Sequence, residues 1–180
     1  MSIIPESKRI VVLGHQRSGT RYMAYLLQAY GYDVGHEEMK IDGISDWHLV
    51  PDYQKHENDF MIHVVRYPLD VIASTLFTSH MNSINFMQRK LDFENRKLFE
   101  AIVMLYMKWN EIIEEKEPDF TIKVEDASKC DWGNLIGVLP PTDCNGRPHA
   151  KLDWDDIEST DRELADQLRN VCRKYGYSAV

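Results

Sequence analysis

A loop bounded by two glycines is the first segment of this chain whose residues could do chemistry. In GHQRSGTR, residues 14–21, Gly14 and Gly19 are separated by four residues, and an apolar run precedes them. Glycines let the backbone turn tightly, so that successive N–H groups point at one anion. A helix that starts near Ser18 would add its positive amino end. The predicted anion site comprises Gly14, His15, Gln16, Arg17, Ser18, Gly19, Thr20 and Arg21.

Two residues of this loop differ from those of a nucleoside-triphosphate loop. Such a loop continues with Lys and then with a Ser or Thr that holds Mg²⁺. Thr20 and Arg21 stand at those two positions, and Arg17 lies inside the loop. The pattern therefore favours anion binding and disfavours metal-dependent transfer of a terminal phosphate. For the glycine spacing alone, a tight turn without a ligand remains the alternative.

A second candidate anion site lies in VVRYPLDVIAS, residues 64–74. Arg66 follows an apolar run, Pro68 suits the first turn of a helix, and Ser74 comes two turns later. A guanidinium can bind phosphate through two parallel hydrogen bonds, and a hydroxyl can add a third. The alternatives are a surface charge for Arg66 and, for Ser74, a helix-facing hydroxyl bonded to its own backbone. His80, Asn82 and Arg89 follow this segment and are predicted to form a mobile flap.

Candidate proton acceptors cluster in GYDVGHEEMKIDGISDWHL, residues 31–49. Glu37 and His36 follow a predicted short strand, which would bring them to the same end of the sheet as the loop, and Glu38 is a weaker third candidate. Either Glu37 or His36 would serve as a general base toward a hydroxyl. Residues 42–48 are predicted to line the acceptor side, with Trp47 and His48 as contacts to a sugar or aromatic acceptor. The alternatives are a solvated polar loop and a Trp47 that is simply buried in the core.

The two anion motifs together resemble those of the sulfotransferase family. GHQRSGT is similar to that family's 5′-phosphosulfate loop, and VVRYPLDVIAS is similar to its 3′-phosphate segment. The resemblance implies 3′-phosphoadenosine 5′-phosphosulfate as donor, its bisphosphate as product, no metal, and a small-molecule or carbohydrate acceptor. It places Arg17 at the leaving phosphate, Arg66 and Ser74 at the 3′-phosphate, and Arg147 at a further phosphate contact. The alternatives are a P-loop kinase and a non-catalytic nucleotide-binding module.

The elements that must position these residues alternate between strand and helix. Strands are predicted at 9–13, 32–34, 60–65 and 120–124, and helices at 18–30, 69–78, 94–115 and 160–175. Residues 36–58 and 139–153 are predicted as loop, the former with short helices. Such alternation predicts an α/β fold with three layers (α/β/α), a mostly parallel central sheet and P-loop-like topology, in one domain over residues 1–180. Ligands of these sheets bind at the carboxyl ends of the strands.

Composition narrows the class of protein further. The 180 residues carry a net charge of −8, which disfavours nucleic acid as a partner. Three cysteines without a CxxC pair argue against a disulfide framework and a zinc site, and the histidines form no metal-binding pair. No apolar run approaches a membrane span or a leader segment, so we expect a cytoplasmic protein. The acceptor and the oligomeric state are left open.

Overall fold

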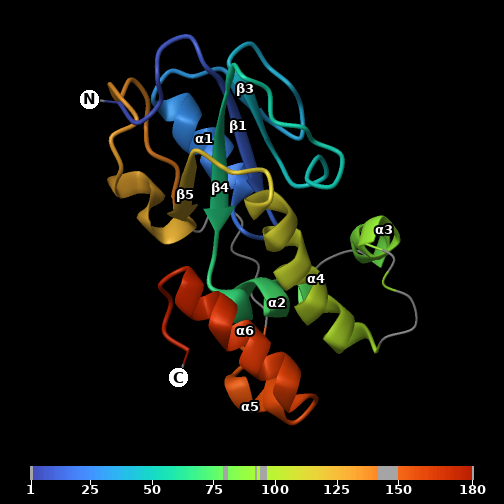
Figure 1. Ribbon diagram of the computed structural model, residues 1–180. Helices are drawn as coiled ribbons and strands as arrows, with labels where there is room; N and C mark the ends of the chain where they lie inside the picture. The colour runs from blue at the N-terminus through green and yellow to red at the C-terminus, as the bar shows by residue number, and fades with distance from the viewer. Residues whose placement is uncertain (1, 79–80, 92, 94–96, 142–149, 180) are drawn as a thin grey trace. The chain divides into compact units, whose positions relative to one another are not determined.

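The computed structural model describes residues 2–78, 81–91, 93, 97–141 and 150–179. It has an α/β fold with a five-stranded, all-parallel sheet flanked by helices, consistent with a three-layer, P-loop-like architecture (Figure 1). The strands lie in the order β2-β3-β1-β4-β5. Their bounds are β1 Arg9–Gly14, β2 Val34–His36, β3 Gly43–Asp46, β4 Asp59–Val65 and β5 Phe120–Lys123. The predicted fold class is confirmed, and the sheet is wholly parallel where mostly parallel was expected.

The chain forms two compact units, each built from two segments. The first unit comprises residues 1–66 and 110–146, and the second comprises residues 67–109 and 147–180. The sheet, α1 (Thr20–Ala29) and the 3-10 helix η1 (Val124–Lys129) belong to the first unit. The second unit is helical, with α2 (Pro68–Thr78), α3 (Met81–Leu91), α5 (Trp154–Glu158) and α6 (Arg162–Lys174). Helix α4 (Leu98–Glu114) contributes to both. The prediction of a single domain stays a prediction.

The centre of the sheet is made by two apolar strands that sequence analysis predicts correctly. In β1 the residues from Ile10 onward are buried, and in β4 all seven residues are buried. Strands buried on both faces need continuous apolar runs, which IVVL and FMI supply. Ile10 pairs with Phe60 and Val12 with Ile62 in parallel register. This pairing aligns the carboxyl ends of β1 and β4, where the loop and Arg66 begin.

Helix α1 begins and ends close to the predicted positions. Its apolar face, including Tyr22, Met23 and Leu26, is buried against the sheet, and Figure 1 shows the helix beside β1 and β3. At its end, Gly31 N–H donates to the Gln28 carbonyl and Tyr32 N–H to the Leu27 carbonyl. Gly31 has φ = 91°, a left-handed conformation that glycine adopts without strain. These bonds form a Schellman motif with Gly31 at C′, the position that the sequence predicted for it.

Strand β3 contradicts the prediction that residues 36–58 are loop. Gly43–Asp46 pairs with β1 on one side and with β2 on the other, so it lies inside the sheet. The sequence GISD contains no apolar run and no alternation, which is why its pattern does not indicate a strand. A Cβ atom at Gly43 would lie 1.8 Å from the Ile10 carbonyl oxygen, so this close pairing requires glycine. Strand β2 also begins two residues later than predicted, at Val34.

The second unit contains two helices that sequence analysis did not predict. Helix α3 occupies the segment assigned to a flap, and it buries Ile84 and Met87. Helix α5 begins at a capping box, in which Asp153 and Asp156 each accept from the other's backbone N–H. The predicted helices at 69–78, 94–115 and 160–175 correspond to α2, α4 and α6. Within this unit, α5 packs against α6, and Arg169 of α6 stacks over the Trp154 ring at 4.8 Å.

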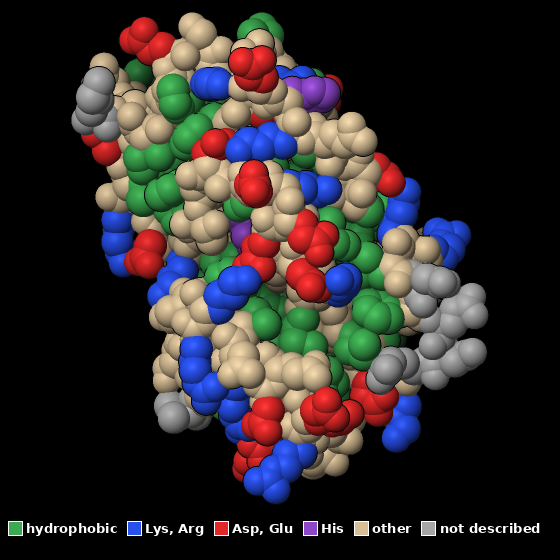
Figure 2. Space-filling model, in the orientation of Figure 1, with side chains coloured by type: hydrophobic (Ala, Val, Ile, Leu, Met, Phe, Trp, Pro, Cys, Tyr) green, Lys and Arg blue, Asp and Glu red, His purple; other side chains and the backbone are tan. Residues whose placement is uncertain are grey.

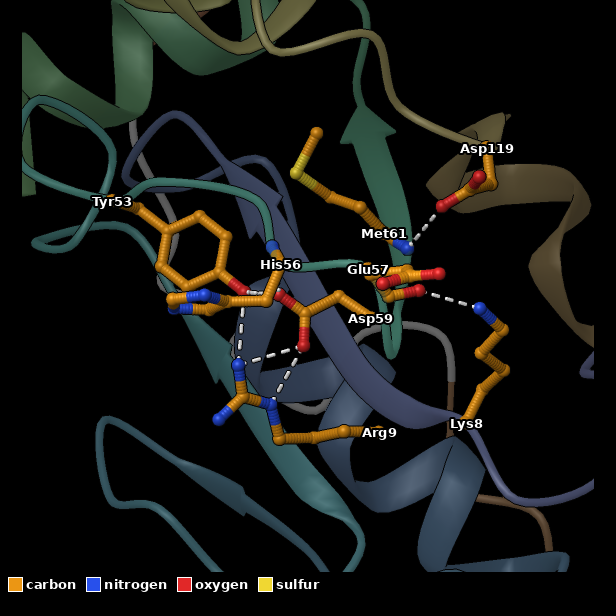
Figure 3. A network of polar contacts seen from close by, with 8 residues as sticks. All are labelled: Lys8, Arg9, Tyr53, His56, Glu57, Asp59, Met61 and Asp119. Carbon is orange, nitrogen blue, oxygen red and sulfur yellow. Dashed lines mark hydrogen bonds and ion pairs between the residues drawn. The ribbon is translucent and has the colours of Figure 1, made fainter.

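The amino end of the sheet, where β1 and β4 begin, is held by a network of polar contacts (Figure 3). Asp59 has a fully buried side chain, and its Oδ1 accepts from Arg9 Nε at 2.8 Å. Its Oδ2 accepts from the Tyr53 hydroxyl and from the His56 backbone N–H. Burial alone would raise the pKa of the Asp59 carboxyl, but these donors together hold that pKa below its usual value. The network therefore fixes Asp59 as a carboxylate.

A second part of the same network ties β4 to the start of β5. Asp119 Oδ2 accepts from the Met61 N–H at 2.7 Å, and the Asp119 N–H donates to the Met61 carbonyl (Figure 3). Lys55 lies 3.0 Å from the Asp119 carboxylate. These bonds lower the pKa of Asp119 despite its partial burial.

On the face drawn in Figure 2, acidic and basic side chains are interspersed, with no extended patch of one sign. Within the residues that the structure describes, no helix is both long enough and apolar enough to cross a bilayer.

Candidate functional site

The loop predicted as an anion site connects β1 to α1 in a strained conformation. Arg17 has φ = 70° and Gly19 has φ = 102°, both in the left-handed region. A Cβ atom at Gly19 would lie 2.5 Å from Cγ2 of Val124, and one at Gly14 would lie 2.8 Å from the Val64 carbonyl oxygen. Both glycines are therefore required by close packing as well as by the turn. A left-handed Arg17 costs about 1–3 kcal/mol, and such strain is concentrated at functional sites.

Two side chains of the loop are buried with polar atoms that bond to nothing in the part of the chain that the structure describes. Ser18 is 0% exposed and Gln16 is 5% exposed. The Ser18 hydroxyl and the Gln16 amide nitrogen have no hydrogen-bond partner there. A buried polar group without a partner costs about 1–3 kcal/mol, so native structures rarely keep one without a role. A hydroxyl and an amide N–H are both donors that an anion would satisfy.

The amino end of α1 follows the loop directly, and its backbone N–H groups are not capped by a side chain. Gly19 is its N-cap, no side chain caps the helix, and no acidic residue lies in the first turn. The first N–H groups of a helix lack partners within it, and the helix dipole favours negative charge at this end. Ser18 and Gln16 thus add unsatisfied donors to an end that already attracts anions.

His15 lies in the loop as a neutral residue. It is fully buried, and its Nδ1 lies 2.6 Å from the Gln16 carbonyl oxygen, which fixes Nδ1 as the donor. Burial lowers the pKa of His15 to about 4. Its positive charge is therefore absent at neutral pH, whereas Arg17 and Arg21 of the loop are permanently charged. Arg66, at the end of β4, donates through Nη1 to the Arg17 carbonyl oxygen at 3.5 Å, so it lies against the loop as predicted.

The predicted base candidates lie at the carboxyl ends of β2 and β3, beside the start of α1. His36 Nε2 is 3.4 Å from the Thr20 hydroxyl and 3.7 Å from Glu37 Oε1. Burial lowers the pKa of His36, the Glu37 carboxylate opposes that shift, and the Arg21 guanidinium adds to it. Thr20 is held in turn by Ser45, whose hydroxyl donates to the Thr20 carbonyl at 2.6 Å. The structure therefore brings His36 and Glu37 together at the loop.

Glu37 is the centre of this group. The Trp47 indole N–H donates to its Oε1 at 2.8 Å, and His48 Nδ1 lies 3.9 Å from the same oxygen. Glu37 adopts φ = 59°, a left-handed conformation in a residue other than glycine. Its N–H donates to the Ser45 carbonyl. Trp47 is 7% exposed, so it is a core residue, which was the alternative to a role at the acceptor. Its indole N–H also positions Glu37.

Asp46 is a residue of the site that sequence analysis did not single out. It ends β3, its side chain is 6% exposed, and its Oδ1 lies 3.3 Å from His48 Nδ1. The His48 backbone N–H donates to the same oxygen. A carboxylate on Nδ1 orients the ring and leaves Nε2 to accept a proton. In the sequence, the only indication of this pair is that Asp46 and His48 are two residues apart in DWH. That spacing places them together only if GISD is a strand, which the sequence does not indicate.

The remaining predicted residues are Ser74, Glu38 and Arg147. Ser74 lies on α2 in the second unit, and its hydroxyl is 3.3 Å from that of Thr78, whose own hydroxyl donates to the Ser74 carbonyl. The Ser74 hydroxyl is thus engaged within its own helix by a side chain, whereas the alternative had it bonded to the backbone. Glu38 is exposed on the β2–β3 connection. His80 and Arg147 fall outside the described residues. Among the described residues, no group of three or more His, Cys, Asp or Glu side chains is arranged to hold a metal ion.

Comparisons with protein-family models, with curated proteins and with solved structures find no match to this chain.

Proposed function

We propose that this protein is a sulfotransferase that uses 3′-phosphoadenosine 5′-phosphosulfate as donor. The observation that carries the proposal is the buried, unbonded Ser18 hydroxyl and Gln16 amide, at the open amino end of α1. A loop with these unsatisfied donors and Arg17 suits a phosphosulfate anion. On the resemblance stated above, the second anionic group of the donor, the 3′-phosphate, would be bound by Arg66 with Ser74, and Arg147 would make a further phosphate contact.

The transfer balances without a metal or a redox partner. The bond between the sulfur and the bridging phosphate oxygen breaks, a bond to the acceptor oxygen forms, and the acceptor proton passes to a base. Negative charge develops on the leaving phosphate, where Arg17 and the loop N–H groups would stabilise it. The product is 3′,5′-bisphosphoadenosine. A sulfuryl group carries less charge than a terminal phosphoryl group, so arginine and backbone donors suffice in place of Mg²⁺.

Three neighbouring side chains are candidates for the proton acceptor. Glu37 and His36 were the candidates from sequence, and the geometry adds His48 held by Asp46. A lowered pKa keeps His36 neutral, and hence able to accept a proton, at pH 7. The test compares pH–rate profiles of Glu37→Gln, His36→Asn and His48→Asn. The low-pH limb, where protonation of the base lowers the rate, should disappear in the variant that lacks the base and should persist in the other two.

Two other functions remain as alternatives. A P-loop kinase would need the Lys and Ser/Thr pair that Thr20 and Arg21 replace, and Thr20 here faces His36. A non-catalytic nucleotide-binding module would bind the bisphosphate and sulfate nothing. The proposal also includes a cytoplasmic setting, which the free thiols of Cys130 and Cys172 support.

The donor class is tested by thermal denaturation with 3′,5′-bisphosphoadenosine and, separately, with ATP and Mg²⁺. A ligand at 100 times its Kd stabilises the folded state by about 2.7 kcal/mol. We expect the bisphosphate to raise Tm and ATP–Mg²⁺ to leave it unchanged. A shift with ATP–Mg²⁺ alone would overturn the proposal in favour of a kinase. Stabilisation by the bisphosphate without sulfated product from any phenol, steroid or saccharide acceptor would favour the non-catalytic module.

A further inference from the structure

The imidazole of His48 lies between a buried carboxylate and an indole ring. Asp46 Oδ1 accepts from the His48 backbone N–H and lies 3.3 Å from Nδ1 of the ring. The ring also lies against the indole of Trp47, with ring centroids 3.7 Å apart and planes tilted by 32°. Two contacts of different kinds therefore hold a ring whose side chain is still 44% exposed, so that a substrate can reach it.

The residues that hold the His48 ring are themselves anchored. Asp46 ends β3, and its side chain is 6% exposed. Trp47 is buried, and its indole N–H donates to Glu37 Oε1 at 2.8 Å. Glu37 thus holds the indole, and the indole in turn supports the imidazole. A catalytic group needs such neighbours, whose own rotamers are locked by packing and by hydrogen bonds.

The register of the sheet places this group beside the anion loop. Strand β3 is the neighbour of β1, and Asp46 pairs with Leu13, the residue that precedes Gly14 of the loop. Because the strands are parallel, their carboxyl ends meet at one edge of the sheet. His48 therefore follows the strand that ends where the loop begins, and both belong to the first unit.

Asp46 determines which nitrogen of the His48 ring carries the proton. A carboxylate only accepts hydrogen bonds, so its oxygen beside Nδ1 favours the tautomer that is protonated at Nδ1. Nε2 then has the lone pair that can take up a proton. Asp46 and Glu37, whose Oε1 lies 3.9 Å from Nδ1, would stabilise the imidazolium that forms. Of the other described titratable groups nearby, His36 lies 3.7 Å from Glu37 Oε1, and Arg21 acts on His36.

We propose that His48 is the proton acceptor of the reaction and that Asp46 is its positioning residue. Glu37 is a second positioning residue, which acts through Trp47 and does not itself take the proton. The chemistry of this inference rests on the proposed function. The proton of the acceptor hydroxyl passes to Nε2, and the hydroxyl oxygen bonds to the sulfur. The electron pair of the broken sulfur–oxygen bond leaves with the phosphate.

The tautomer is measured on the full chain, without donor or acceptor, from long-range ¹⁵N–¹H spectra of the histidine rings at alkaline pH, where the rings are neutral. His48→Asn identifies the His48 signals, which we expect to show the proton on Nδ1. Asp46→Ala should move it to Nε2, the site that a histidine ring prefers in water. Asp46→Asn should keep it on Nδ1, because an oxygen that accepts from the His48 N–H is retained. Glu57→Gln, at the other end of the sheet, is the control and should change nothing.

Turnover is the second measurement. His48→Asn should lower kcat about 100-fold or more, with little change in the KM of the donor, and should remove the low-pH limb. Asp46→Ala should lower kcat, and Asp46→Asn should restore part of it. Glu37→Gln should keep the low-pH limb, because its amide oxygen can still accept from the indole.

Three outcomes would overturn the inference: a proton on Nε2 in the parent, an unmoved proton in folded Asp46→Ala, or a low-pH limb that is lost with Glu37→Gln or His36→Asn instead. A parent that makes no sulfated product would overturn the proposed function, while the ring spectra would still show whether Asp46 positions His48. The two failures are therefore distinguishable. The backbone spectrum of each variant reports whether it has folded.

Discussion

Buried polar side chains are fully hydrogen-bonded at the amino end of the parallel sheet, whereas two of them lack partners among the described residues at its carboxyl end. At the amino end, the buried Asp59 carboxylate is bonded to Arg9, Tyr53 and the His56 N–H. At the carboxyl end, the buried Ser18 hydroxyl and Gln16 amide have no partner among the described residues. Both ends belong to the same unit and use the same strands. The difference separates polar groups that stabilise the fold from polar groups that, under the proposed function, would bind the donor anion.

The largest loss of stability is expected from a substitution at the amino end of the sheet. Asp59→Ala removes the acceptor of three donors and leaves the Arg9 charge without its partner. Loss of one member of a buried ion pair costs about 3–5 kcal/mol, and the partly exposed Arg9 places the expected loss near the lower value. Chemical denaturation should show it. Any protein that remains folded should bind 3′,5′-bisphosphoadenosine with unchanged affinity, because the network lies at the other end of the sheet.

Glu57→Gln is the matched control for Asp59→Ala. Its side chain is exposed in the same connection, and its contact with Lys8 uses the backbone carbonyl, which the substitution keeps. The free energy of unfolding should change by less than about 0.5 kcal/mol. Equal destabilisation by both changes would show that the network does not fix this end.

The two ends should also lose stability in different ranges of pH. The pKa of buried His15 is lowered to about 4, so between that value and its ordinary value of about 6.5 the unfolded state binds one more proton. Stability should therefore fall as the pH drops through this range, by up to about 3 kcal/mol, and His36 with its lowered pKa adds to the same trend. The pKa values of Asp59 and Asp119 are also lowered, so their contribution is lost only below about pH 4.

Urea midpoints from pH 8 to pH 3 measure both ranges. His15→Asn should flatten the profile between about pH 6.5 and 4, and Asp59→Asn should flatten it below about pH 4. A His15→Asn profile that keeps its full slope in the upper range would contradict the burial argument.

The smallest expected effect on stability is at Ser18, and its sign is the opposite of that at Asp59. Ser18→Ala removes a buried hydroxyl without a partner, so the free energy of unfolding should rise by about 1 kcal/mol. Affinity for 3′,5′-bisphosphoadenosine should fall about tenfold, which corresponds to the loss of one hydrogen bond to an anion. Calorimetric titration and urea denaturation of the same sample test the pair of outcomes.

Thr121→Ser on β5 is a control for Ser18→Ala, because it also removes one small group but leaves the loop intact. The Thr121 side chain is exposed, so this change should alter neither the free energy of unfolding nor the affinity for 3′,5′-bisphosphoadenosine. A Ser18→Ala variant that is less stable and binds as well as the parent would mean that the hydroxyl serves the fold.

The sequence by itself determined the strands and helices that carry strong periodic or apolar patterns. IVVL and FMIHVV are long apolar runs and became β1 and β4, and Gly31 marked the end of α1. It also located the loop, because glycine spacing is a local requirement of the backbone. The position of Arg66 beside the loop followed from its place after β4, since parallel strands bring their carboxyl ends to one edge.

Only the tertiary structure decided what depends on neighbours far along the chain. GISD is a strand because Ile10 and Val34 lie on either side of it with backbone groups to pair, and its own pattern does not indicate one. The Asp46–His48 pair could be recognised only after that strand was in place. The contrast between the bonded Asp59 and the unbonded Ser18 is likewise invisible in sequence, because burial and hydrogen bonding are properties of the packed chain.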